Sequence, residues 1–460
     1  MDEPREKQWI SQLRSIVDED ELLVKPEECA PYGKDKWFAE AMPDAVVLAN
    51  SAQTVSRVMK FANEHRIPIT ARGAGHGYVG GCVPVMGGIT ISTERLNKIK
   101  EINPDDFVAV VEPGVRTQTL QDEVEKMGLF YPPDPASRTE CSIGGNIVTN
   151  AGGPRCLKYG VTRDYVLGLE VVLADGTIVK LGGRTHKNKA GFDLHRLFVG
   201  SEGMLGIVTE ATLKLLPLPP FRALLVAGFP SAALAASALR AVLRAGFLPC
   251  ALEIADEFTL AAARKRTGSK RLEGSNAMLF VELDGQEQSV KIELQTVEKI
   301  VSGFNPMFTD RAFGASECEK LWELRREFSY ALRDTGLTKL NEDVVVPRSR
   351  LEDLFIFAAE LQKKYGFPVA CFGHAGDGNI HVNIMVDYEK QDAKEKSRET
   401  LDELFKKIIE WGGAITGEHG VGIAKKDWWQ MALPKEAVRL HRLIKNALDP
   451  NNILNPGKFI

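Results

Sequence analysis

The run ARGAGHGYVGG at residues 71–81 constrains this chain most strongly, because five of its eleven residues are glycine. Glycine reaches positive φ and lets a ligand approach the backbone closely, so successive N–H groups can point at one anion. A pyrophosphate is a natural guest for such a loop. The spacing is not G-x-G-x-x-G at the start of a helix, which argues against a nicotinamide-binding fingerprint.

The residues around this run read as alternating strands and helices. Ala45–Leu48 is a short apolar strand, Ser51 can cap the helix that follows, and Ile67–Ala71 is a second strand leading into the glycines. A first helix is expected from Trp9 to about Asp18. Further strands are expected at Ile89–Ser92, Val108–Val111, Leu167–Leu173 and, after an Asp175-Gly176 turn, Ile178–Leu181.

Other glycine-rich and proline-rich segments occur in the same half of the chain. They are VEPGV at 111–115, YPPDPAS at 131–137, SIGGNIVTNAGGPRCLKYG at 142–160 and GSEGMLGIVTEATLKL at 200–215. So many small-residue turns around short strands suggest a long ligand lying against backbone. The alternative is a β-rich domain with tight turns and no ligand.

The pattern changes after LLPLPP at Leu215–Pro220, which looks like a linker. Longer helical patterns then alternate with apolar strands, which predicts an α+β domain with an antiparallel sheet. We therefore expect an N-terminal helix and loop at 1–42, one domain at 43–219, a second at 220–415 and a C-terminal segment at 416–460.

Two motifs of the second half concentrate histidine, although the chain has only eight. CFGHAGDGNIHVNIM carries His374 and His381, and ITGEHGVG carries Glu418 followed by His419. Two imidazoles and a carboxylate suit zinc, manganese or iron(II). Their spacing is not a standard zinc signature, so hydrogen-bonded loop histidines remain an equal alternative.

Composition narrows the functional class. Of 460 residues, 44% are hydrophobic and 26% charged, with a net charge of −4 and no basic run, so we expect no nucleic-acid partner. No apolar stretch is long enough to span a bilayer, and the acidic N-terminus lacks the apolar core of a signal peptide, which predicts a cytoplasmic protein. The seven cysteines are widely spaced without C-x-x-C, which argues against a disulfide framework or an iron–sulfur cluster.

The motifs GGNIVTNAGG, KYGVTRDYVLGLEVVLADG and GSEGMLGIVTEATLKL, in this order, resemble the FAD-binding domain of the vanillyl-alcohol oxidase/PCMH flavoprotein superfamily. Within it the chain is similar to the branch of GlcD-like glycolate oxidase chains and D-lactate dehydrogenases, from about Pro43 to the C-terminus. The resemblance implies a PCMH-type FAD-binding domain, then an α+β cap domain with an antiparallel sheet that carries the substrate site. It also implies that the C-terminal segment returns to the FAD domain.

The resemblance also implies which residues hold FAD. These are Arg72, Gly73, Ala74, Gly75, His76, Gly77, Tyr78, Pro133, Asp134, Ser137, Gly144, Gly145, Asn146, Ala151, Gly152, Gly153, Glu202, Gly203, Gly206, Ile207 and Val208. The loop reads GAGHG, whereas this branch often has a hydroxyl residue at the position of His76. Other branches bond a histidine there to the flavin ring, so His76 is either an 8α-histidyl attachment site or a noncovalent loop residue.

For the second half, the resemblance implies that His374, His381 and Glu418 ligate a divalent metal and that His419 is the catalytic base. It places Asn383 and Arg325 at the substrate, with Arg325 as the clamp for its carboxylate. Ser329 and Lys339 are further substrate-binding candidates.

The expected activity is therefore an FAD-dependent dehydrogenase that oxidises a small 2-hydroxy acid such as D-lactate or glycolate. The hydride goes to flavin N5, and the electrons pass to an acceptor protein or quinone, or to partner subunits. Three alternatives stay open. They are a metal-dependent hydrolase, which leaves the glycine motifs without a role; a non-catalytic flavin-binding subunit; and a covalent-FAD carbohydrate or alcohol oxidase, suggested by His76.

Overall fold

The computed structural model describes residues 7–270 and 273–460, and the first six residues of the expected N-terminal segment lie outside that range. The chain forms two compact units. Unit 1 comprises Met1–Ala151, Val161–Leu218 and Glu418–Ile460. Unit 2 comprises Gly152–Gly160 and Pro219–Gly417. The C-terminal segment thus returns to the unit that contains the glycine-rich run.

Unit 1 begins with a small sheet whose strand order is β1-β2-β4-β3. β2 (Ala45–Leu48), β4 (Ile89–Ser92) and β3 (Ile69–Arg72) run parallel, and β1 (Leu22–Leu23) adds an antiparallel edge. α3 (Ala52–His65) connects β2 to β3. It begins at Ser51, whose hydroxyl accepts a hydrogen bond from Thr54 N, and it packs its apolar stripe into the core. The predicted β-α-β unit is confirmed.

The second sheet of unit 1 has the order β5-β6-β10-β8-β9, and all neighbours are antiparallel. Its strands are β5 (Ile99–Asn103), β6 (Val108–Val111), β8 (Val166–Val172), β9 (Ile178–Gly182) and β10 (Ile207–Lys214). The remaining elements of unit 1 are α1 (Gln8–Leu13), α2 (Pro26–Cys29), α4 (Thr117–Glu125), β7 (Leu129–Phe130), α5 (Ile143–Thr149), α7 (His195–Phe198), β11 (Leu216–Pro217), α14 (Lys426–Ala432) and α15 (Lys435–Leu448).

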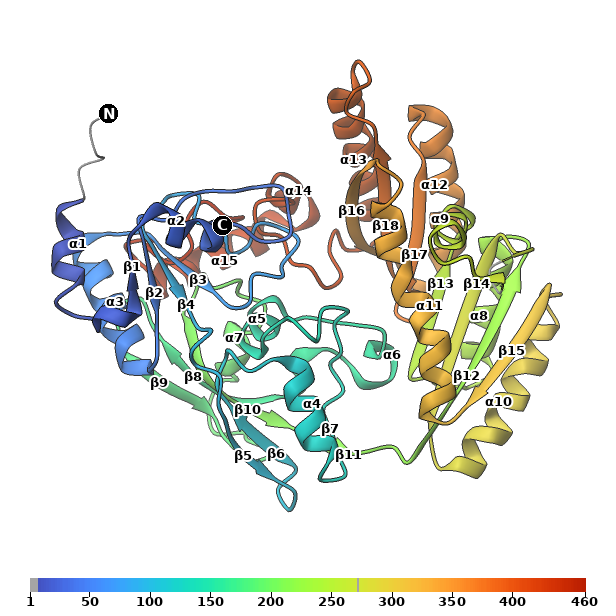
Figure 1. Cartoon of the computed structure of the whole chain (residues 1–460), viewed down its shortest axis with the longest axis horizontal. Coiled ribbons are helices and arrows are strands. Elements are labelled where there is room, and N and C mark those ends of the chain that lie inside the picture. Colours follow the sequence, from blue (N-terminus) through green and yellow to red (C-terminus); the bar gives the residue numbers. More distant parts are fainter. Residues whose placement is uncertain (1–6, 271–272) are drawn as a thin grey trace. The chain divides into compact units, whose positions relative to one another are not determined.

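Unit 2 is built on a seven-stranded antiparallel sheet with the order β15-β12-β14-β13-β17-β18-β16 (Figure 1). Its strands are β12 (Phe221–Phe229), β13 (Ala251–Ala255), β14 (Ala277–Gly285), β15 (Phe308–Phe313), β16 (Thr338–Val345), β17 (Val369–His374) and β18 (Asn379–Val386). This is the predicted antiparallel sheet.

Helices cover both faces of this sheet. α9 (Glu257–Thr267) and α11 (Ala315–Arg333) share one apolar core with the strands. α8 (Ala232–Arg244), α10 (Glu287–Ser302) and α12 (Leu351–Tyr365) pack together, and α13 (Ala393–Glu410) packs on α12 and β18 (Figure 1). The short helix α6 (Cys156–Tyr159) joins unit 2 through Tyr159, whose hydroxyl donates to Asp284 Oδ2 at 2.7 Å.

Four predicted elements differ in their boundaries. β8 spans Val166–Val172 rather than Leu167–Leu173, and β9 ends at Gly182 rather than Leu181. The other two differ for local reasons. The first helix ends at Leu13 rather than near Asp18, because Asp18 caps a separate short helical turn at Glu19–Glu21. β3 starts at Ile69 rather than Ile67, since Pro68 has no N–H for a sheet. The strands expected at Ile89–Ser92 and Val108–Val111 are confirmed residue for residue.

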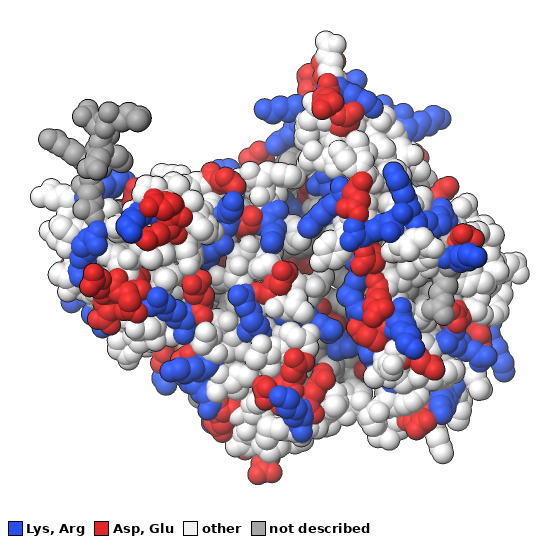
Figure 2. All heavy atoms as spheres, in the orientation of Figure 1, with Lys and Arg blue, Asp and Glu red and all other residues white. Residues whose placement is uncertain are grey.

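Charged side chains of both signs are interspersed on the face shown in Figure 2, in keeping with the net charge of −4. Among the described residues, none of the helices combines the length and apolar composition that crossing a bilayer requires.

Candidate functional site

The glycine-rich loop of unit 1 follows β3 and lies against the start of α5. Ser142 caps α5, where its hydroxyl accepts hydrogen bonds from Gly145 N at 3.4 Å and from Ala74 N at 3.3 Å. A Cβ on Gly73 would lie 2.6 Å from the same hydroxyl, and Gly75 has φ +71°. Only glycine fits these two positions, so the loop offers bare backbone beside α5.

Other predicted FAD segments meet at the same short helix. Gly200 N and Glu202 N donate to the carbonyls of Ile147 and Val148, at 3.0 and 2.8 Å. Gly144 N donates to Pro113 O at 2.8 Å, which joins the VEPGV turn. Segments far apart in the sequence thus form one backbone-lined region within unit 1.

The YPPDPAS segment is attached to this region through α4. Gln121 donates its side-chain amide to the carbonyls of Tyr131 and Pro133, at 3.2 and 3.0 Å. Thr117, at the start of α4, accepts a hydrogen bond from the Asn146 side chain at 2.7 Å. Two segments that the resemblance assigned to FAD are therefore held on one helix.

Glu202 fastens the C-terminal segment to the same region. Its carboxylate accepts hydrogen bonds from Val421 N at 2.7 Å and Gly422 N at 2.8 Å. Burial raises the pKa of Glu202 to about 7, although these two bonds oppose the rise. Asn455 donates its amide to Gly81 O and Glu202 O, at 2.9 and 2.7 Å. These bonds show that Glu202, predicted as a cofactor residue, also holds the loop that carries His419.

Two side chains of the glycine loop point to protein partners. Arg72 donates to the carbonyls of Lys34 and Pro31, at 2.6 and 3.2 Å, and so anchors the N-terminal segment. His76 Nδ1 lies 3.5 Å from Glu140 Oε2, and burial lowers the pKa of this imidazole. Whether His76 bonds covalently to a flavin stays a prediction.

The structure sorts the remaining predicted FAD residues by unit. Gly152 and Gly153 group with unit 2, directly after Ala151, which is in unit 1. The others lie in unit 1: Gly77, Tyr78, Asp134, Ser137, Gly203, Gly206, Ile207 and Val208.

The two predicted histidine ligands lie at the paired ends of β17 and β18 in unit 2. His374 ends β17 opposite Asn379, the first residue of β18. His381 lies opposite Phe372 on β17 and Asp343 on β16. Paired residues of neighbouring strands point to the same face, and the two imidazole centroids are 5.5 Å apart. The tight Gly376–Asn379 turn therefore brings both rings to one place.

A buried carboxylate that the sequence analysis missed holds His374. Glu253 on β13 is fully buried, and its Oε1 lies 2.5 Å from His374 Nδ1. Its Oε2 accepts hydrogen bonds from Arg325 Nε at 2.8 Å and Nη2 at 2.6 Å. Burial alone would raise the pKa of Glu253, but His374 and Arg325 together lower it to about 2. A single glutamate in the apolar strand ALEIA was the signal for it.

A second carboxylate, Asp343, lies beside His381. Asp343 Oδ1 is 4.0 Å from His381 Nδ1 and accepts a hydrogen bond from the Asn379 amide at 2.6 Å. Its Oδ2 accepts from Thr416 Oγ1 at 3.0 Å and from Gly417 N at 2.8 Å. Asp343 thus fixes the chain where ITGEHGVG begins.

Glu418 follows Gly417 directly, so its place is set by that anchored peptide. His374, His381 and Glu418 each offer one ligand atom, and these atoms lie within 4.8 Å of one another. Two imidazoles and one carboxylate are a donor set that zinc, manganese and iron(II) accept. The residues present therefore fit a divalent metal.

The predicted substrate residues lie on the same sheet face and on α11. Asn383 donates its amide to the carbonyls of Ala370 and His381, both at 3.0 Å, while its buried Oδ1 has no hydrogen-bond partner among the described residues. Lys339 Nζ donates to Ser329 Oγ at 2.9 Å. Burial, together with nearby Arg333, lowers the pKa of Lys339 to about 8.

The predicted base, His419, lies in unit 1 beside the glycine loop. Its ring centroid is 5.2 Å from that of Tyr78, with the planes tilted by 31°. Its Nε2 is 4.0 Å from Glu418 Oε1, and 13% of its side chain is exposed. The loop that carries His419 begins at the Asp343 anchor and continues to the Glu202 anchor.

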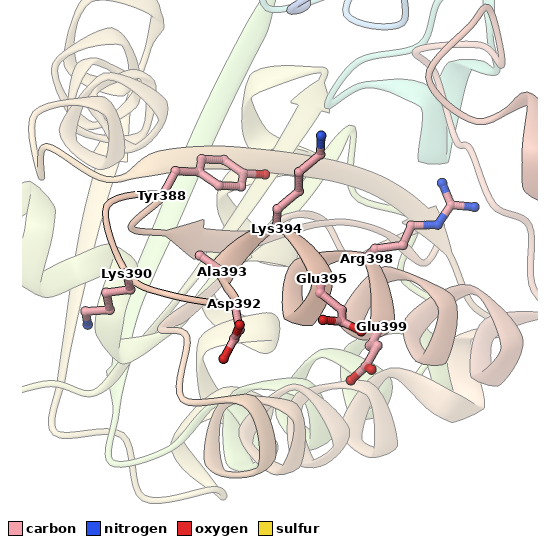
Figure 3. A pocket seen from close by; sticks show the side chains of 8 residues that line it. All are labelled: Tyr388, Lys390, Asp392, Ala393, Lys394, Glu395, Arg398 and Glu399. Carbon is pink, nitrogen blue, oxygen red and sulfur yellow. The ribbon is translucent and has the colours of Figure 1, made fainter.

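A separate surface pocket lies between β18 and α13. Tyr388, Lys390, Asp392, Ala393, Lys394, Glu395, Arg398 and Glu399 line it (Figure 3). In Figure 3 these side chains point in several directions around the start of α13 rather than converging. None of the predicted site residues is among them.

Comparisons with known proteins match both halves of the chain. A model of the "FAD binding domain" matches residues 43–182, and a model of "FAD linked oxidases, C-terminal domain" matches residues 218–459. Glycolate oxidase subunit GlcD of Bacillus subtilis is 42% identical over 91% of this chain and 89% of its own length. D-lactate dehydrogenase of Archaeoglobus fulgidus is 36% identical over 98% of this chain and 99% of its own.

Solved structures share the fold at low sequence identity. p-Cresol methylhydroxylase with bound substrate matches with a TM-score of 0.81 and 21% identity over 98% of this chain and 96% of its own. Alkyldihydroxyacetonephosphate synthase matches with a TM-score of 0.77 and 21% identity over 100% and 86%. These findings confirm the predicted superfamily, its branch and its PCMH-type fold. They favour a flavin-dependent oxidoreductase over a hydrolase.

Proposed function

The chain belongs to the family of FAD-linked oxidases, and we propose that it oxidises the hydroxyl group of a small 2-hydroxy acid to the 2-oxo acid. The names of its relatives, glycolate oxidase subunit and D-lactate dehydrogenase, support this substrate class. The observation that carries the proposal is the set of ligand atoms from His374, His381 and Glu418, within 4.8 Å of one another. A 2-hydroxy acid has two oxygens on neighbouring carbons, which suits chelation at such a centre.

In this proposal His374, His381 and Glu418 hold a divalent metal. Bound there, it would supply Lewis acidity toward the substrate hydroxyl. Asn383 supports the assignment, because its buried Oδ1 has no partner among the described residues and can accept a hydrogen bond from the substrate. Three protein ligands would leave coordination positions open for a substrate, as in catalytic rather than structural metal sites.

Cationic side chains of unit 2 would bind the carboxylate group of the substrate. Arg325 uses two of its five N–H donors on Glu253, so its other donors can bind a second carboxylate. Lys339 adds an ammonium group and Ser329 a hydroxyl, already joined at 2.9 Å. These three side chains would select an acid over a neutral alcohol.

His419 is the proposed base. Neutral imidazole takes up a proton near neutral pH, so His419 can accept the hydroxyl proton of the substrate while the α-hydrogen leaves with its electron pair. FAD bound in unit 1 would supply the acceptor for that hydride. The loop 72–78, the start of α5 and the segment around Glu202 would hold the cofactor through backbone groups. Together the proton and the hydride remove two protons and two electrons from the substrate, which gives the 2-oxo acid.

We further propose that the electrons pass to a separate acceptor protein or quinone, and that the protein works in the cytoplasm. The relatives called glycolate oxidase subunit support a partnership with other chains. No C-x-x-C motif is present that would suggest an iron–sulfur relay within this sequence.

An anaerobic absorbance spectrum of the purified protein tests the proposal, before and after D-lactate, glycolate or D-2-hydroxyglutarate is added in turn. We expect a flavin band that bleaches with at least one acid. A flavin band that none of the acids bleaches would contradict the substrate class. Absorbance that stays with the acid-precipitated protein would show covalent flavin, and H76A would then release it.

A further inference from the structure

Glu253 is a fully buried carboxylate of the unit 2 sheet that contacts two of the proposed site residues. It lies in the middle of the apolar strand β13, with 0% exposure and both carboxylate oxygens bonded. A buried carboxylate away from water costs free energy unless cations and donors compensate it. The two compensating groups are His374, assigned above to the metal, and Arg325, assigned above to the substrate carboxylate.

The bond to His374 determines which ring nitrogen faces a metal. Glu253 is paired with a permanent cation, since its Oε2 accepts two hydrogen bonds from the Arg325 guanidinium, and it is therefore ionised. An ionised carboxylate only accepts hydrogen bonds, so His374 Nδ1 must carry the proton that it donates across 2.5 Å. In the neutral ring Nε2 is then the nitrogen with the lone pair, which a metal requires. Partners of this kind orient histidine ligands and raise their basicity.

The bonds to Arg325 hold the guanidinium equally firmly. Both of them, from Nε and Nη2, end on Glu253 Oε2. The guanidinium carbon also lies 4.8 Å from the ring centre of Phe372 and 5.5 Å from that of Phe328. A planar cation fixed by one carboxylate and two rings loses little further freedom when it binds another carboxylate.

We propose that Glu253 is a positioning residue that couples the metal ligand His374 to the substrate clamp Arg325 through one buried carboxylate. This inference rests on the proposed function. Each oxygen serves one partner, so the distance between the metal and the substrate carboxylate is set by a single rigid group on β13. A 2-hydroxy acid, whose hydroxyl and carboxylate are separated by one carbon–carbon bond, requires such a fixed spacing.

Replacing Glu253 with glutamine exposes this coupling, because an amide has one oxygen and one NH₂ group. Arg325 is the stronger donor and takes the oxygen, so the NH₂ group faces His374 Nδ1. The imidazole must then accept at Nδ1 and carry its proton on Nε2, which blocks metal binding. In E253Q/R325M the cation is absent, and the amide oxygen can turn back to His374.

The test measures the affinity for Zn²⁺ of chelator-stripped, FAD-loaded protein by competition with a fluorescent zinc chelator. We expect E253Q to bind Zn²⁺ about 10–100-fold more weakly than the wild type, and R325M to bind it almost normally. E253Q/R325M should recover to within about fivefold of R325M, which a purely structural role would not produce. A second titration measures the affinity for oxalate from the change in flavin absorbance. R325M should bind oxalate at least tenfold more weakly than the wild type.

Glu282 provides the matched control. It lies on the neighbouring strand β14 opposite Ala251, is also buried, and bonds to Arg222 and to the indole N–H of Trp322. E282Q should destabilise the fold yet leave the affinity for Zn²⁺ within about twofold.

Three results would overturn the coupling. The first is unchanged Zn²⁺ binding by E253Q while the wild type binds Zn²⁺, which leaves the proposed function intact. The second is a wild type that binds neither Zn²⁺ nor Mn²⁺, which also removes the metal from the proposed function. The third result applies if E253Q does not fold, in which case a second variant takes its place. E253L/R325M, which buries no unpaired charge, must then bind Zn²⁺ at least tenfold more weakly than R325M, and equal affinities would refute the role of Glu253.

Discussion

The two units build their sites from different parts of the chain. In unit 1 the region assigned to FAD is made of backbone: glycine turns, peptide N–H groups and carbonyls joined around α5. In unit 2 the site is made of side chains that project from one sheet face. Glu253, His374 and His381 lie on the adjacent strands β13, β17 and β18. A backbone site is damaged by adding atoms, and a side-chain site by removing them. Each unit therefore calls for its own kind of substitution.

The largest effect is expected at His419, which lies in unit 1 and is proposed to act by its side chain. His419→Ala removes the proposed base, and flavin reduction by substrate should slow about 10³-fold. The FAD content should stay at the wild-type level, because FAD binding is assigned to backbone groups rather than to this side chain. Stopped-flow absorbance under anaerobic conditions measures the rate. Reduction at the normal rate would remove His419 from the chemistry.

The next largest effect should come from adding one carbon atom to the backbone site. A Cβ on Gly144 would lie 2.5 Å from Pro113 Cβ and 3.1 Å from its backbone. G144A should therefore displace the start of α5, cost about 1–3 kcal/mol of stability and weaken FAD binding at least tenfold. The affinity for Zn²⁺ of the ligand set His374, His381 and Glu418 should not change.

Gly183 is the control for G144A, since a Cβ there meets no atom within 4 Å. G183A should bind FAD normally, and fluorescence titration of the apoproteins with FAD compares the two variants. Equal FAD affinity in G144A and the wild type would mean that the cofactor does not rest on α5.

The pH dependence of kcat/KM should test the contribution of Lys339 to the side-chain site. Lys339 loses its proton as the pH rises through its pKa of about 8, and the attraction for a substrate carboxylate goes with it. Since kcat/KM reports the free enzyme, it should fall about tenfold per pH unit above pH 8. K339R should keep its charge and move this decline to higher pH. A profile that is the same in K339R and the wild type would assign the decline to another group.

The smallest effect is expected at Arg326, the neighbour of Arg325 on α11. Its side chain is 45% exposed and pairs with Glu319 at 2.7 Å. Such surface pairs contribute about 0–1 kcal/mol, so R326A should change the folding equilibrium constant by less than about fivefold. KM should stay within about twofold of the wild-type value, because Arg326 is not among the proposed substrate-binding residues. Steady-state kinetics check this, and a large rise in KM would show that the clamp was assigned to the wrong arginine.

The same contrast explains what could be predicted from the sequence. Backbone sites need glycine at fixed positions, so the unit 1 segments stood out, and Ser51 and the apolar runs located α3 and its strands. His374 and His381 were found because histidine is rare and a glycine turn joins them. Glu253 could not be assigned, because its partners Arg325 and His374 lie 72 and 121 positions away. Only the order of strands in the sheet brings them together.

Asp343 was missed for a related reason. In the segment NEDVVVP it looks like a polar residue at the start of a strand, yet the pairing of β16 with β18 buries it fully beside His381. The ends of elements were the least predictable feature, since they depend on single residues such as Asp18 and Pro68.

The central claim is that backbone in one unit holds the flavin while side chains and a divalent metal activate the acid. One experiment tests it directly: anaerobic flavin reduction by the preferred 2-hydroxy acid, in protein stripped with a chelator and then given Zn²⁺ or Mn²⁺. The stripped protein should keep its flavin spectrum, fail to bleach with the acid, and bleach once metal is returned. Bleaching at the full rate by protein shown to contain no metal would contradict the account.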